Sequence, residues 1–280
     1  MGERQNRTLE AAGSTPVCSI SVNHIKCMAK KFVLVSNDDG IFADGLNFLC
    51  RELVNEFDIV VVAPDSERSN VGHAITLSMP LKVEEVKLPC GITGYSVNGM
   101  PADCIKIAVS SLLNRKPDIV ISGINLGSNL GIDVLYSGTV SAATEAVILG
   151  IPSFAISLDT LENPDFSYAA RFAKAFAGFI IKERLLGNIV LNVNVPNVKP
   201  FGVKVVPLSK ARYKERFEKR INPRKKVYYW LTGEFMEEND IEDSDIRALK
   251  DGFITVTPLN IDLTDYRYLD LMAKWKFENI

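Results

Sequence analysis

From Lys31 onward, short apolar runs rich in Val and Ile alternate with longer stretches in which apolar residues recur every three or four positions. This alternation constrains the fold more than any other feature of the chain, because it is typical of parallel strands joined by crossover helices. Near-continuous Val, Ile and Leu predicts strands that are buried on both faces of the sheet. The predicted strands are Phe32 to Val35, Ile59 to Ala63, Ile119 to Ser122, Phe154 to Ser157 and Val190 to Val195. The predicted helices span residues 45–56, 101–114, 139–149 and 165–185.

The pattern therefore predicts an α/β fold with a Rossmann-like open, mostly parallel sheet and crossover helices on both faces. One segment, Ile75 to Val86, contains Pro80 and predicts an edge hairpin rather than a crossover. After Pro200 the pattern changes, and a C-terminal β-hairpin arm, a final strand and a terminal helix are expected.

The expected arm carries opposite charges on its two sides. Lys210 to Lys226 holds nine basic and two acidic residues, and Gly233 to Asp245 holds seven acidic residues and no basic one. The aromatic segment between them reads as a strand. An arm of this kind suits pairing with another surface such as a second subunit, although a charged hairpin folded on its own domain is an equal alternative.

Composition excludes several classes of protein. In 280 residues, 47% are hydrophobic and 24% charged, which is typical of a folded globular protein. No stretch approaches the roughly 18 consecutive apolar residues that a membrane span requires. The net charge of -2 argues against a protein that coats nucleic acid. The five cysteines are scattered, which predicts a reducing compartment rather than a disulfide framework. Only two histidines are present, which excludes a zinc site built from several imidazoles, so a metal here needs mostly oxygen ligands.

Polar side chains follow three predicted strands at their carboxyl ends, which is where ligands bind in an open parallel sheet. Asp38 and Asp39 follow the first strand, Ser69 lies in the loop after the second, and Asn125 follows the third. Two adjacent carboxylates repel each other unless a cation lies between them, and neutral oxygens complete its shell without added charge. All-oxygen ligation favours Mg²⁺, Mn²⁺ or Ca²⁺. Each of these polar segments, taken by itself, has an alternative interpretation as a turn whose side chains cap backbone amides.

Ser137, Gly138 and Thr139 directly precede a predicted helix. Free backbone amides at a helix N-terminus, together with two hydroxyls, suit a phosphate, although a simple helix cap is equally common. No P-loop or dinucleotide-binding glycine motif occurs in the chain. A divalent cation beside a phosphate site predicts phosphoryl chemistry.

Long segments of the chain resemble the SurE family of stationary-phase survival proteins, which are divalent-metal-dependent nucleotidases. The segments are VLVSNDDG (33–40), VVAPDSERSNVGHAIT (61–76), NGMPADCIKIA (98–108), ISGINLGSNLGIDVLYSGTVSAATEA (121–146) and GIPSFAIS (150–157). The resemblance runs in order from about Lys31 to the end of the chain, and it includes the YYW segment and FITVTPL at 253–259. The one departure near the site is Ser128, where relatives often have proline.

The resemblance implies hydrolysis of nucleoside 5′-monophosphates, and also of some 3′-monophosphates and short polyphosphate, in the cytoplasm. It implies one divalent cation per subunit, with Mg²⁺ or Mn²⁺ as the first candidates, and a homodimer or homotetramer formed by exchange of C-terminal arms. The implied metal ligands are Asp38, Asp39, Ser69 and Asn125. The implied phosphate-binding residues are Asn37, Asn129, Ser137, Gly138 and Thr139.

Two catalytic questions stay open in the sequence. The phosphate could be attacked by a water, or directly by Asp38 with formation of an aspartyl phosphate. His73 could protonate the leaving oxygen, or it could hold its loop by a hydrogen bond. The candidate catalytic residues are therefore Asp38, Asp39 and His73.

The chain is expected to have three parts. We expect residues 1–27 to form a flexible tail, residues 28–200 the α/β catalytic core, and residues 201–280 a C-terminal extension.

Two other classes of function are alternatives. A strand followed by an acidic pair also opens Mg²⁺-binding receiver domains, but such a domain needs an aspartate after its third strand, where this chain has Asn125. The basic segment with Tyr213 and Phe217 resembles a single-strand-binding stripe, but the acidic stretch that follows offers internal neutralisation. We therefore expect neither nucleic acid nor a membrane as a partner.

Overall fold

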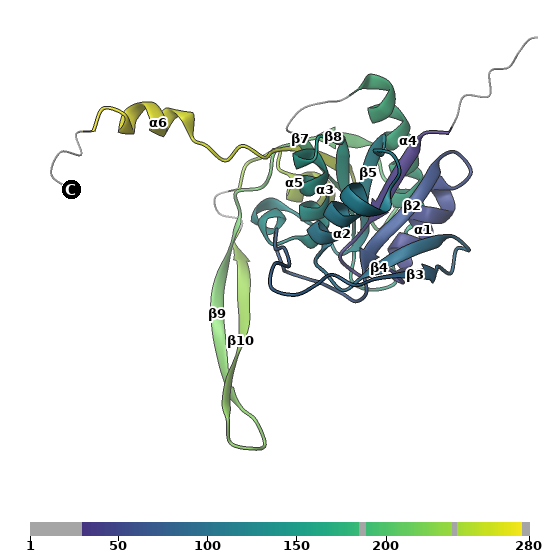
Figure 1. The fold of residues 1–280 in the computed structure, drawn as a ribbon. Coiled ribbons are helices and arrows are strands. Elements are labelled where there is room, and N and C mark those ends of the chain that lie inside the picture. The colour runs from purple at the N-terminus through teal and green to yellow at the C-terminus, as the bar shows by residue number, and fades with distance from the viewer. Residues whose placement is uncertain (1–29, 185–188, 237–239, 276–280) are drawn as a thin grey trace, which may run out of the picture.

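The computed structural model describes residues 30–184, 189–236 and 240–275, and in these residues nine strands pair into one sheet (Figure 1). The predicted tail, residues 1–27, lies outside the described residues. The strand order across the sheet is β3-β4-β2-β1-β5-β6-β7-β11-β8. The strands are β1 (Phe32–Ser36), β2 (Asp58–Pro64), β3 (Val83–Lys87), β4 (Thr93–Val97), β5 (Ile119–Leu126), β6 (Ser153–Asp159), β7 (Ile189–Pro196), β8 (Val203–Val205) and β11 (Ile254–Asn260).

The centre of the sheet is parallel. Neighbours from β4 through β2, β1, β5 and β6 to β7 all run in the same direction, whereas β3 pairs antiparallel with β4 and β11 pairs antiparallel with β7. The five predicted strands are all present, because continuous Val and Ile runs bury both faces of a central strand. β11 belongs to the predicted C-terminal extension and yet completes the sheet of the core.

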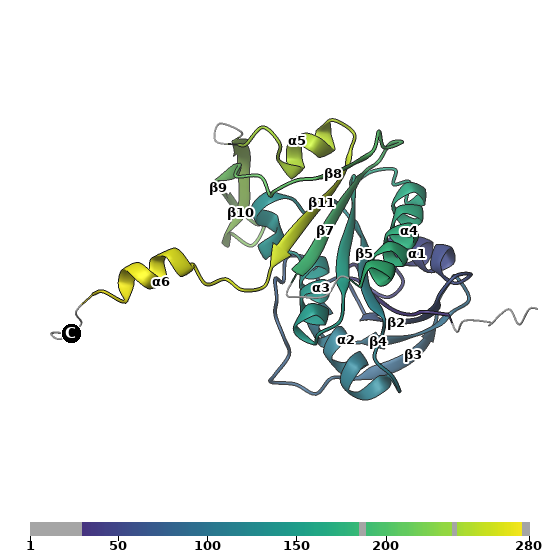
Figure 2. The same cartoon turned by 90° about the horizontal axis from the view of Figure 1, so that it is seen from above.

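Helices cover both faces of the sheet, as Figure 2 shows from above. α1 (Asp44–Leu53) and α4 (Ser167–Glu183) pack on one face around Leu46, Leu49 and Ala173. α2 (Pro101–Ile107) and α3 (Gly138–Ile148) pack on the other face around Ile105 and Ala142. The predicted α/β fold class is therefore confirmed.

Two local predictions differ from the structure. The edge hairpin is formed by β3 and β4, whereas residues 75–82 of the predicted hairpin form no strand. Pro80 removes a backbone donor there, and the antiparallel turn lies later, around Gly91 with a φ of +87°. α2 ends at Ile107 and continues as a short π-helical segment, Ala108–Leu112, rather than as one helix to residue 114.

The arm is present as a two-stranded antiparallel hairpin of β9 (Arg212–Ile221) and β10 (Val227–Met236). It projects from the core as a long ribbon, and α6 (Tyr266–Met272) lies away from the core on an extended segment (Figure 1). A short helix that the sequence pattern did not predict, α5 (Asp245–Lys250), packs against β11 and β7. Within the described residues, no helix is both long and apolar enough to cross a membrane.

The core makes one prediction about stability. Phe154 in β6 is fully buried, and its ring meets that of Phe176 edge-on at 5.3 Å between centroids. We expect Phe154→Ala to lower the free energy of unfolding by about 3–5 kcal/mol, because it removes this packing and leaves a cavity. Urea unfolding followed by circular dichroism measures the change.

The matched control is Phe179→Ala, because Phe179 lies on α4 with 54% of its surface exposed. We expect the control to change the free energy of unfolding by less than about 1 kcal/mol. Equal losses in the two variants would contradict the placement of Phe154 in the core.

Candidate active site

The site lies at the carboxyl end of β1, where the chain changes direction across the sheet. β1 is flanked by β2 on one side and by β5 on the other, and the connections leave toward opposite edges. The loops after these strands separate at such a switch point and leave a crevice. The side chains that follow β1, β2 and β5 therefore meet, as the sequence pattern predicts.

Asp38 and Asp39 follow β1 directly and differ in their surroundings. Asp38 is buried, and its carboxylate accepts hydrogen bonds from the hydroxyl and the backbone N–H of Thr139. Burial nevertheless raises the pKa of Asp38 above its usual range. Asp39 Oδ2 accepts a hydrogen bond from the backbone N–H of Leu126 at 3.1 Å. Burial and the neighbouring Asp38 raise the pKa of Asp39 to about 7. Both carboxylates are thus held where a positive charge would stabilise them.

The N-terminus of α3 lies directly against Asp38. A side chain at Gly138 would place its Cβ 2.8 Å from Asp38 Oδ2, so only glycine permits this approach. Ser137 Oγ accepts from the backbone N–H of Val140 at 3.1 Å and caps the helix. The helix-cap alternative is therefore correct for the Ser137 side chain, and the hydroxyl of Thr139 is bound to Asp38. What α3 offers to an anion is its positive end, because the backbone N–H groups of Thr139 and Val140 already donate to Asp38 and Ser137.

One cavity of about 580 Å³ collects most of the predicted site residues. Its lining includes, from that set, Asp38, Asp39, Ser69, Asn125, Asn129 and Ser137. Asn125 Nδ2 donates to the carbonyl of Gly127 at 2.7 Å, which leaves its Oδ1 as the atom for a ligand. Ser69 Oγ donates to Glu67 Oε1 at 2.5 Å. The cavity therefore combines Asp38 and Asp39 with neutral oxygens from the loop after β2 and from the end of β5, and its lining also includes Asp44, Glu67 and Asp133.

Asn129 is anchored from two neighbouring strands. Its backbone N–H donates to Asn194 Oδ1 at 2.8 Å, and its carbonyl accepts from the side-chain amides of Asn192 (2.8 Å) and Asn194 (3.0 Å). Its own Nδ2 donates to Ser157 Oγ at 2.7 Å. Both backbone polar groups of Asn129, its N–H and its C=O, are thus fixed by β7, and the side chain is bonded to β6.

Asn37 lies behind the cavity. Its side chain is fully buried, and Nδ2 donates to the carbonyl of Gly40 at 2.9 Å, which holds the turn that carries the two carboxylates. Its Oδ1 is buried without a hydrogen-bond partner.

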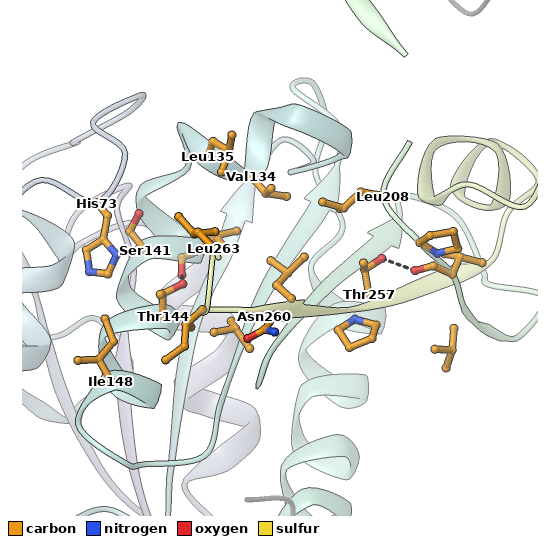
Figure 3. A pocket seen from close by; sticks show the side chains of 18 residues that line it. His73, Val134, Leu135, Ser141, Thr144, Ile148, Leu208, Thr257, Asn260 and Leu263 are labelled. Atoms are coloured by element: carbon orange, nitrogen blue, oxygen red, sulfur yellow. Dashed lines mark hydrogen bonds between the residues drawn. The ribbon is translucent and has the colours of Figure 1, made fainter. Parts of the chain in front are cut away.

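His73 lies in a second and larger cavity of about 900 Å³, which is mainly apolar (Figure 3). Its Nε2 is 2.9 Å from Glu145 Oε2, and Lys106 Nζ donates to the other oxygen of that buried carboxylate at 2.7 Å. Burial acts to raise the pKa of Glu145, but these two contacts hold it below its usual range. His73 therefore fastens its loop to α3.

Several lining residues of the first cavity were not predicted. Glu67 stands in the loop after β2, within two positions of Ser69, so its place in the sequence could have indicated it. The apolar wall has no comparable signal, because it comes from the segment after β6. This wall includes Leu161, Pro164 and Phe166.

The donor set fits a hard cation when neutral oxygens are counted together with the two carboxylates. In the part of the chain that the structure describes, no group of three or more His, Cys, Asp or Glu side chains could hold a metal. Two carboxylates with serine and asparagine oxygens are, however, the donors that Mg²⁺ and Mn²⁺ accept. Burial raises the pKa of both carboxyls, and for Asp39 the neighbouring Asp38 raises it further, so a bound cation would stabilise their ionised forms.

Comparison with known proteins agrees with this architecture. The family model described as "Survival protein SurE" matches residues 33–215. A relative from Syntrophus aciditrophicus described as "5'-nucleotidase SurE" is 49% identical over 241 residues, covering 85% of this chain and 91% of the relative. A second relative with the same description, from Pelotomaculum thermopropionicum, is 48% identical over 244 residues, covering 86% and 94% of the two chains.

A solved structure has the same fold. The crystal structure of the SurE protein from Aquifex aeolicus superimposes with a TM-score of 0.76 at 39% identity, and the match covers 86% of this chain and 98% of that one. Sequence identity of this extent, over a chain whose strand ends converge on one acidic pair, leaves a single assignment: this chain belongs to the SurE family.

Proposed function

We propose that this protein is a divalent-metal-dependent phosphatase that hydrolyses nucleoside 5′-monophosphates to nucleoside and phosphate. The observation that carries the proposal is the meeting of Asp38 and Asp39 with the N-terminus of α3 at one cavity. The description of the relatives as 5′-nucleotidases supports the same substrate class. Nucleoside 3′-monophosphates and short polyphosphate present a similar terminal phosphate, so they belong in the same assay.

The residues that would hold one cation per subunit are Asp38, Asp39, Ser69 and Asn125. Their oxygens are hard donors from the loops after β1 and β2 and from the end of β5, all around one cavity, which favours Mg²⁺ or Mn²⁺. Such a cation supplies neutralisation of phosphate charge and a lowered pKa of a coordinated water. Thr139 contributes by donating to Asp38, which orients that carboxylate and offsets part of the rise in pKa that burial causes.

The phosphate group would lie at the N-terminus of α3, beside Asn129. The positive end of the helix dipole favours a charged phosphate there and stabilises the charge that develops during hydrolysis. Asn129 is fixed by the asparagines of β7, so the loop needs little reorganisation when substrate binds. The apolar wall around Phe166 offers a surface for the nucleoside.

Two role assignments follow from the contacts. Asp38 Oδ1 is engaged by Thr139, which favours a fixed ligand over an attacking nucleophile. His73 lines the neighbouring cavity and is bonded to Glu145, which favours a role in positioning the loop over that of an acid. The receiver-like signalling module has no support, because the matching relatives are described as nucleotidases.

We further propose a homodimer or homotetramer in the cytoplasm, assembled through the C-terminal arms. The large apolar cavity is lined by α3, β11 and Leu263 (Figure 3), and α6 continues from this segment with exposed Tyr268, Leu269 and Leu271. The hairpin also leaves Tyr229 exposed. Apolar surface of this extent is unfavourable in water, and a second copy of the chain would cover it.

The first prediction concerns the acidic pair. We expect wild-type protein with Mg²⁺ or Mn²⁺ to release phosphate from a panel of nucleoside 5′- and 3′-monophosphates and short polyphosphate, with the 5′-monophosphates as the best substrates. Asp39→Asn should lower the rate at least about 100-fold, because it removes a charged ligand. Asp159→Asn is the matched control, since Asp159 is an exposed carboxylate at the end of β6 outside the cavity. Turnover that survives both EDTA and Asp39→Asn would refute the proposal.

A second prediction concerns pH and stability without metal. The pKa of Asp39 is about 7 in the folded protein against an ordinary 3.8, so ionisation above pH 4 costs the folded state more than the unfolded state. In EDTA, Asp39→Asn should therefore be more stable than wild type by about 4 kcal/mol at pH 8, and this gain should shrink toward pH 5. Thermal unfolding at the two pH values measures it.

Added Mn²⁺ should reverse this order at pH 8, because it stabilises only the protein that binds it. A stability difference that is the same at pH 5 and pH 8 would show that repulsion at Asp39 is not its cause.

A third prediction concerns assembly. Light scattering should give a mass of two or four times the 31.0 kDa of one chain. Trp230→Asp, at an aromatic residue of β10 with 56% of its surface exposed, should shift the population toward smaller species, whereas Phe179→Asp on α4 should not. A monomeric wild-type protein would contradict assembly through the arms.

A further inference from the structure

The loop between β5 and α3 is held from a part of the chain that is remote in sequence. This site loop, residues 126–137, lines the cavity at Asn129 and Ser137. Between these two residues, the backbone N–H of Gly131 donates to Asp245 Oδ2 at 2.9 Å. Asp245 is the first residue of α5 and is fully buried.

The same carboxylate also holds the root of the arm. Its Oδ1 accepts from the backbone N–H groups of Ser209 (2.8 Å) and Ile246 (2.9 Å), and Ser209 stands just before β9. Asp240, which follows β10, accepts from Ser209 Oγ at 2.7 Å. One carboxylate thus joins the site loop to the place where the arm leaves the core.

Packing supports this connection independently of the hydrogen bonds. A side chain at Gly131 would place its Cβ 3.2 Å from the carbonyl oxygen of Ser209, and Gly131 has a φ of +51°. The loop and the arm root therefore touch through backbone atoms at this point. A displacement of Ser209 would therefore move the backbone at Gly131, because no flexible side chain lies between the two to take up the shift.

We infer that Asp245 is a positioning residue of the active site, which sets the site loop against the root of the arm by binding Gly131 and Ser209 with its two oxygens. Asn194 holds the same loop from β7, at Asn129, so the loop is fixed from two sides. When the arm packs on a second copy of the chain, any shift of the arm root then reaches the phosphate-binding residues through the site loop. This inference rests on the proposed function for its kinetic consequence, but not for the tie itself.

The test is Asp245→Asn in the full-length protein. The amide keeps the size of the side chain, but its NH₂ faces either Gly131 N–H or the pair of N–H groups at Ser209 and Ile246, so one tie is lost. We expect kcat/KM for a nucleoside 5′-monophosphate to fall about 10- to 100-fold, mainly through kcat, because the loop is misplaced during reaction. Mn²⁺ binding, measured by calorimetry, should be retained, because Asp38 and Asp39 come from the end of β1.

Two further acidic residues serve as comparisons. Asp243→Asn makes the same change at an exposed position two residues earlier and should leave the kinetics unchanged. Asp240→Asn loosens the arm root but has no bond to Gly131, so its loss of kcat/KM should be smaller than that of Asp245→Asn. An equal loss of kcat/KM in Asp240→Asn and Asp245→Asn would overturn the inference. Loss of Mn²⁺ binding in Asp245→Asn would overturn it as well.

Hydrogen–deuterium exchange tests the tie without reference to activity. Amides of residues 126–137 should exchange faster in Asp245→Asn than in wild type, and those of β1 should not. Unchanged exchange in the loop of Asp245→Asn would overturn the inference even if the activity of the variant falls. If the wild type shows no nucleotidase activity but the loop exchanges faster in the variant, only the proposed function is refuted. If Asp245→Asn does not fold, Gly131→Ala disturbs the same contact from the loop side and takes its place in both measurements.

Discussion

The site depends on keeping two adjacent carboxylates at the end of a buried strand. Burial of these carboxylates is unfavourable to their ionised forms and raises the pKa of both, and at Asp39 the neighbouring charge of Asp38 adds to the rise. The structure offsets part of it with the positive end of α3, with two donors from Thr139, and with the N–H of Leu126. The remainder is what makes the cavity a site for a cation, because a positive charge removes the repulsion that the protein itself leaves in place.

Much of the surrounding structure serves to bring α3 close enough. Gly138 must lack a side chain because Asp38 fills the space that a Cβ would need. Ser137 ends the loop with a helix cap, so the direction of α3 is set at the residue next to the carboxylate. Asn37 holds the turn after β1 from behind. The contacts of Asn37 and Ser137 are local in sequence, three residues apart, whereas the approach of Gly138 to Asp38 joins segments about 100 residues apart.

The site loop, residues 126–137, is held by β7 and α5, which lie toward the β8 edge of the sheet. Asn194 in β7 and Asp245 in α5 bind neighbouring parts of the loop through its backbone, so they fix its path whatever its side chains are. The second cavity is lined by residues along α3 and is mainly apolar, and His73 lies there, bonded to Glu145. The N-terminus of α3 therefore faces a polar cavity suited to a phosphate, while its length lines an apolar surface suited to another chain.

The central strands, the four main helices and the placement of Asp38, Asp39, Ser69 and Asn125 at one edge follow from the sequence alone. Apolar periodicity reports burial, and parallel strands bring their carboxyl ends to the same edge. The β3–β4 hairpin, α5, the helix-capping role of Ser137 and the position of His73 were decided only by the tertiary structure. Short, half-exposed elements have weak periodicity, and a hydroxyl or imidazole takes its partner from whatever packing places beside it. Asp245 shows this most clearly, because its role arises from backbone N–H groups of Gly131 and Ser209, which carry no mark in the sequence.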